Sequence, residues 1–111
     1  MTDCELLELA AKAAGLNYSF EYGCYFDDEY EQGCDWNPLD DDGDALRLAV
    51  KLGLDVCIDL QLENKPHTHV IGFRCDHSAE TIEAIEYHGD PYAATRRAIV
   101  RAAAEIGRGM E

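Results

Sequence analysis

The stretch Trp36 to Val50, with the sequence WNPLDDDGDALRLAV, decides more of the fold than any other part of this chain. Pro38 ends an extended segment, because the residue before a proline is held away from the helical region. A carboxylate at Asp41 or Asp42 can accept the free amide hydrogens of a first helical turn, so a helix is predicted to begin there. Its buried face is predicted to contain the apolar residues Ala45, Leu46, Ala49, Val50 and Leu52.

Two glycines are placed where helices end. Gly15 and Gly53 each follow an apolar helical stretch and precede a leucine. This is the pattern of a left-handed residue at a helix C-terminus, followed by an apolar residue that folds back on the last turn. Thr2 and Glu5 form a capping box ahead of the first glycine, which predicts a first helix from about Asp3 to Ala14.

The last predicted helix begins after Asp90. An aspartate in the N-cap position with Pro91 at the first helical position is a common helix start. Gly107 is predicted to close this helix.

A hairpin is predicted between the second and last helices. From Val56 the apolar residues recur every second position, and the turn-forming residues 63–66 follow. The segment from His67 to Cys75 reads as the partner strand, with Ile71 and Phe73 pointing inward. The hairpin therefore supplies two strands of an antiparallel sheet.

Two further segments are harder to assign. Residues 81–87 fit neither period cleanly, and helix and strand both stay open, although the β-branched and aromatic content favours a third strand. Residues 17–35 suggest a short strand that runs into an acidic, irregular loop. The element order predicts one α+β domain, in which three to four antiparallel strands pack with three helices.

The composition narrows the choice of function. The chain has 111 residues, 47% of them hydrophobic, which suits a single core. Its 23 acidic and nine basic residues leave a formal charge of −14, which disfavours direct binding to nucleic acid or an anionic membrane. No leader or membrane span is evident, and five cysteines make an odd count, so a cytoplasmic protein with reduced thiols is expected.

The Trp36 to Val50 block, the first helix and the closing helix from Asp90 together resemble small tailed-phage and prophage proteins, a group called the phage ABA-sandwich domain. The resemblance implies a phage or prophage origin and helices on both faces of the sheet. It implies no activity. The Trp36 to Val50 block is interpreted as specifying the fold, and the segments 17–35 and 55–88 as the parts individual to this protein.

An acidic cluster is the first candidate for a functional surface. Ten carboxylates and no lysine or arginine lie between Glu21 and Asp44. Carboxylates interleaved with aromatic residues are typical of a surface that docks on a basic groove, while a solvated loop with helix-capping aspartates is the plainer alternative. The predicted partner-binding residues are Asp27, Asp28, Glu29, Tyr30, Glu31, Asp35, Asp41 and Asp42.

A second candidate is a metal site on the hairpin. His67 and His69 are two apart on one predicted strand and project together, and Cys75 or His77 could add a ligand to zinc. The paired-cysteine spacing of most zinc sites is missing, so a hairpin with solvent-facing histidines is favoured. No cofactor is predicted.

These observations favour a non-catalytic protein that binds a host or phage protein with a basic surface. Imitation of nucleic acid, and inhibition of a host defence complex of the CRISPR or restriction type, fit the charge. The alternatives are a small metal-binding module or metalloenzyme built on the histidines, and a self-associating phage protein without catalytic activity.

Overall fold

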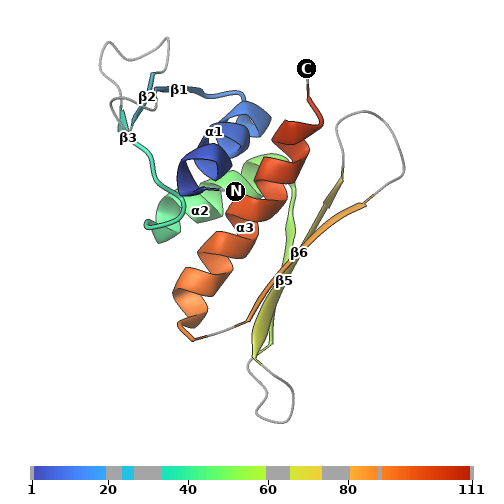
Figure 1. Ribbon diagram of the computed structural model, residues 1–111. Helices are drawn as coiled ribbons and strands as arrows, with labels where there is room; N and C mark the ends of the chain where they lie inside the picture. The colour runs from blue at the N-terminus through green and yellow to red at the C-terminus, as the bar shows by residue number, and fades with distance from the viewer. Residues whose placement is uncertain are drawn as a thin grey trace.

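The computed structural model describes residues 2–19, 24–26, 34–59, 66–73, 81–87 and 89–110 (Figure 1). The elements run in the order α1 (Asp3–Ala14), β1 (Asn17–Ser19), β2 (Cys24–Phe26), β3 (Cys34–Asp35), α2 (Asp42–Leu52), β4 (Asp55–Asp59), β5 (His67–Phe73), β6 (Thr81–Tyr87) and α3 (Pro91–Arg108). The fold is α+β, as the sequence predicts.

The strands form two antiparallel sheets. The larger sheet has the order β4-β5-β6, with Val56 paired to Val70 and Val70 paired to Ala84. The smaller sheet has the order β1-β2-β3, of which the sequence predicted only the first strand. Residues 81–87, ambiguous in the sequence, form the strand β6.

The helix α3 occupies the centre of the molecule (Figure 1). One side of α3 packs against β5 and β6, and another side packs along α1 and α2. In the part of the chain that the structure describes, all three helices lie on the same side of the larger sheet. Helices on both faces, which the phage resemblance implied, are therefore not found among these residues.

The core around α3 is built largely from small side chains. Alanines from α1 and α3 are completely buried in this core, namely Ala10, Ala98, Ala102 and Ala103. Small residues let two helix backbones approach closely, because no large side chain separates them. The larger side chains Trp36, Leu48 and Val70 complete the same core.

The helix ends around α1 and α2 are as predicted. The Thr2 side chain accepts a hydrogen bond from the Glu5 amide (3.2 Å), which caps α1. Gly15 and Gly53 have φ angles of 73° and 63°, the left-handed region that favours glycine. The amides of Leu16 and Leu54 then bond back to the carbonyls of the final turns (2.9 Å each), completing the expected C-terminal motif.

The predicted buried face of α2 was partly wrong. Ala45 and Ala49 are buried as expected, but Leu46 and Val50 are 64% and 73% exposed, and Leu48 is buried instead. The helix carries two overlapping apolar stripes. Packing against α3 and α1 buries the stripe that contains Ala45, Leu48 and Ala49, and leaves Leu46 and Val50 exposed.

The inward face of β5 was also predicted wrongly. Thr68, Val70 and Gly72 are buried toward α3, while Phe73 is 62% exposed and Ile71 only partly buried. Thr68 is fully buried because its hydroxyl pairs with the Thr95 hydroxyl of α3 (2.7 Å), which satisfies both groups.

Gly107 does not close α3. The helix continues to Arg108 and is capped at Gly109, and Gly107 is buried within the final turn. Its α-carbon lies against the backbone of α1, where a side chain would overlap the Leu9 carbonyl. This glycine is required by the close approach of two helices rather than by a helix end.

Candidate functional site

The turn between Trp36 and α2 is held together by its own carboxylates. Asp41 accepts a hydrogen bond from the Asp44 amide (2.8 Å), and Asp44 accepts one from the Asn37 amide (3.0 Å). The Asp44 carboxylate also pairs with Arg47 (2.6 Å). Asp41 therefore satisfies one free amide at the start of α2, and Asp44 joins the first turn of the helix to Asn37.

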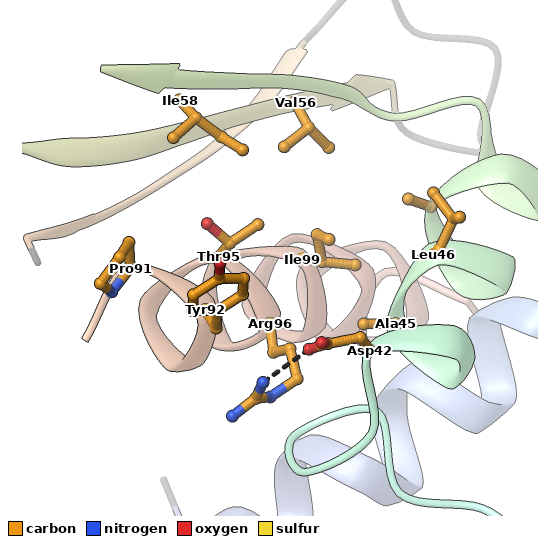
Figure 2. Close-up of a pocket in the computed structure, with 11 residues that line it drawn as sticks. Asp42, Ala45, Leu46, Val56, Ile58, Pro91, Tyr92, Thr95, Arg96 and Ile99 are labelled. Carbon is orange, nitrogen blue, oxygen red and sulfur yellow. Dashed lines mark hydrogen bonds and ion pairs between the residues drawn. The ribbon is translucent and has the colours of Figure 1, made fainter. Parts of the chain in front are cut away.

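Arg96 links this turn to the helix α3. Its Nε donates to the Leu39 carbonyl (2.9 Å), and its guanidinium pairs with Asp42 (2.6 Å), as Figure 2 shows for the ion pair. The Arg96 side chain is only 16% exposed, whereas that of Asp42 is 69% exposed. The hydrogen bond to Leu39 is part-buried, so it is less screened by solvent than the ion pair.

Replacing Arg96 with alanine is expected to lower the free energy of unfolding by about 1–2 kcal/mol, because the change leaves the Leu39 carbonyl unpaired and removes the packed stem. Urea unfolding followed by circular dichroism measures the loss. Arg108→Ala is the matched control on the same helix, since Arg108 is 64% exposed and pairs with Glu105 three residues earlier. The control should lose less than about 0.5 kcal/mol. Equal losses in the two variants would contradict this role for Arg96.

A second group of ion pairs links α1, β6 and α3. Arg97 contacts Asp3 and Glu86 (3.2 Å each), and Arg101 contacts Glu86 (3.0 Å). Asp3, Asp40 and Arg97 line one shallow depression with Leu7 and Asn37. The acidic start of α1 and the acidic turn before α2 are therefore neighbours on one surface.

Three of the predicted partner-binding residues, Asp35, Asp41 and Asp42, lie in the part of the chain that the structure describes. Asp41 and Asp42 are exposed but also bond within the chain, as the helix cap and the partner of Arg96. Asp35 is the last residue of β3. Residues 27–31, with the predicted Asp27, Asp28, Glu29, Tyr30 and Glu31, lie outside the described residues.

An apolar groove lies between β4, α2 and α3 and has a volume of about 410 Å³. Figure 2 shows Val56 and Ile58 of β4 facing Tyr92 and Ile99 of α3, with Leu46 of α2 at one end. Three of its lining side chains are well exposed: Leu46 (64%), Ile58 (54%) and Tyr92 (69%). This groove was not predicted from the sequence, because Leu46 was expected to lie in the core. The two overlapping apolar stripes of α2 were the available signal.

Two histidines of the predicted metal site, His67 and His69, lie on the face of the sheet that points away from α3. His67 and His69 do project to the same face, as expected. The His67 ring lies 6.0 Å from the Tyr87 ring, and His69 Nε2 lies 3.9 Å from a Glu83 carboxylate oxygen. Cys75 and His77 fall outside the described residues. Within the described ranges, no three side chains of His, Cys, Asp or Glu are grouped to hold a metal ion.

Cys4 and Cys57 are exposed free thiols. None of the described helices has the length and apolar character needed to cross a membrane.

Comparison with known proteins assigns the chain to no family. The protein-family models give no match, and neither the curated proteins nor the solved structures give a significant one.

Proposed function

We propose that this chain is a non-catalytic interaction protein that binds a partner protein through the partner's basic surface. In its specific form, the chain is a phage or prophage accessory protein acting in the cytoplasm of the bacterial cell. There it would occupy a nucleic-acid-binding groove of a host defence complex.

The surplus of negative charge carries this proposal. Every arginine in the described ranges, from Arg47 to Arg108, already forms an ion pair with a carboxylate of the same chain. Other carboxylates are exposed and form no ion pair with a described residue, namely Glu5, Glu8, Asp40 and Asp55. With a formal charge of −14, the chain has too few cations to neutralise its surface. A basic partner would supply them.

The surface formed by Asp3, Asp40 and the turn at Asp41 and Asp42 supports this reading. Three of its carboxylates are held in place: Asp41 by its hydrogen bond to the start of α2, and Asp3 and Asp42 by arginines of α3. Charges held in fixed positions lose little side-chain freedom on binding, so they are suited to matching the spaced cations of a nucleic-acid-binding groove.

Affinity capture tests the proposal. The tagged protein is incubated with bacterial lysate at about 0.05 M and about 0.3 M NaCl, and bound proteins are identified by mass spectrometry. We expect one basic complex to be retained at low salt and its affinity to fall roughly tenfold at the higher salt, because exposed charges are screened. Competing DNA should displace a nucleic-acid-handling partner. Recovery of no basic protein at either salt concentration would refute the proposal.

Two double variants that remove the same amount of charge test where the partner binds. Asp27→Asn with Asp28→Asn, and Glu83→Gln with Glu105→Gln, each remove two negative charges. The first pair should weaken the captured complex, and the second should leave it nearly unchanged. Asp41 and Asp42 are unsuitable for this test, since their loss would also disturb the start of α2. Equal weakening by both pairs would indicate general charge attraction and no specific surface.

A further inference from the structure

The apolar groove lies beneath an uncovered part of the larger sheet. Val56 and Ile58 are on the face of β4 that points toward the helices, yet Ile58 remains 54% exposed. The central helix α3 packs against β5 and β6, so the space below β4 is left to the groove. Leu46 and Tyr92, both exposed, point into the same space (Figure 2).

The strand β4 is also an edge of its sheet. It pairs with β5 on one side, and no described strand pairs with it on the other. An edge strand presents unpaired backbone groups that can bind another extended segment. A strand added here would lie about 4.8 Å farther out, and its alternate side chains would point into the groove.

The side chains on the outward face of β4 indicate which residues an added strand would carry. Asp55, Cys57 and Asp59 alternate with Val56 and Ile58, so the opposite side chains of an added strand would meet two carboxylates. Opposite charges stabilise directly opposed cross-strand pairs, and like charges destabilise them. A second copy of β4 in antiparallel pairing about Cys57 would set Asp55 against Asp59 at both ends. The charges therefore favour a strand with outward lysine or arginine over self-pairing.

We propose that β4 and the apolar groove bind an extended segment of the partner protein in which apolar and basic residues alternate. This inference rests on the proposed function and adds the mode of binding. The apolar side chains enter the space bounded by Leu46, Ile58 and Tyr92. The basic side chains lie beside Asp55 and Asp59, and the partner's backbone pairs with the edge of β4.

Synthetic peptides test this proposal on the complete chain. The probe is a fluorescent decapeptide of alternating valine and lysine, and its binding is followed by fluorescence anisotropy. One control has the same composition arranged in pairs, and another replaces every valine with serine. Only the alternating valine–lysine peptide should bind well, and its binding should protect the β4 amides from hydrogen exchange.

Two lysine substitutions on α2 distinguish peptide binding in the groove from a general effect of the added charge. Leu46→Lys places a charge in the groove, and Val50→Lys places the same charge on an exposed residue of α2 that does not line it. The first should weaken peptide binding roughly tenfold to a hundredfold, as expected for losing one buried leucine contact. The second should have little effect, and both variants should fold because both positions are exposed.

Several outcomes would overturn the proposal. Equal binding of the serine peptide, equal effects of the two variants, or binding without protection of β4 would each do so, while leaving capture of a basic partner by the acidic surface intact. A dimer by light scattering that Leu46→Lys converts to monomer would assign the groove to a second copy instead. Failure of every peptide overturns this site alone, and the proposed function fails only if lysate capture also recovers no basic protein.

Discussion

Gly107→Ala is expected to lower the free energy of unfolding by more than about 3 kcal/mol. The new β-carbon would overlap the carbonyl oxygen of Leu9 and would lie 2.8 Å from its carbonyl carbon. It would also approach the Ala13 amide nitrogen to 3.3 Å. These are backbone atoms of α1, so no side-chain rotation relieves the contact.

Whether Gly107→Ala raises or lowers the free energy of unfolding distinguishes two reasons for a glycine at this position. If the glycine merely occupied a helical position, alanine would stabilise α3 by about 1 kcal/mol through its higher helix propensity. If it permits the close approach of α1 and α3, alanine must push the helices apart and disturb the alanine-rich core.

Urea unfolding of the wild type and the variant measures the difference. Gly89→Ala is the control, because a β-carbon there has no neighbour within 4 Å. An unchanged or raised stability of the Gly107 variant would show that the two helices are not in close contact at this point.

Trp36→Ala is expected to cost about 3–5 kcal/mol, since it removes a large buried ring and leaves a cavity. The Trp36 side chain is 5% exposed and belongs to the core formed with α1, α2 and α3. It immediately precedes the turn that positions α2, so the loss should also loosen the acidic turn. Trp36→Phe, which keeps an aromatic ring, should cost less.

Circular dichroism in urea follows both variants. The wild-type protein has a single tryptophan, so its fluorescence reports the same unfolding transition independently. Tyr92→Ala is the control for aromatic truncation: Tyr92 is 69% exposed, and its loss should change stability by about 0.5 kcal/mol or less. A Trp36→Ala protein as stable as the Tyr92 variant would contradict the core position of Trp36.

The candidate site was only partly predictable from the sequence. The excess of carboxylates and the aspartates before α2 are visible in the sequence. That Asp41 and Asp42 bond within the chain depends on a particular turn and on Arg96, which is more than fifty residues away. The groove was missed because it forms only where residues from β4, α2 and α3 meet.

The sequence by itself determined the three helices, the hairpin and most of the helix ends. Local chemistry decides these features: Thr2, Asp41 and Asp90 cap the helices, and Gly15 and Gly53 allow the left-handed turns after them. Such signals act between residues a few positions apart, so they can be recognised without knowledge of distant contacts.

Only the tertiary structure decided which faces of those elements are buried. The apolar residues of α2 lie on two overlapping stripes, and β5 has apolar residues on both faces, so neither pattern selects one face. The choice follows from contacts between distant segments. Thr68 is buried because Thr95 satisfies its hydroxyl, and Gly107 touches the backbone of α1. These contacts join residues far apart in the chain, and their fit depends on the position of whole helices.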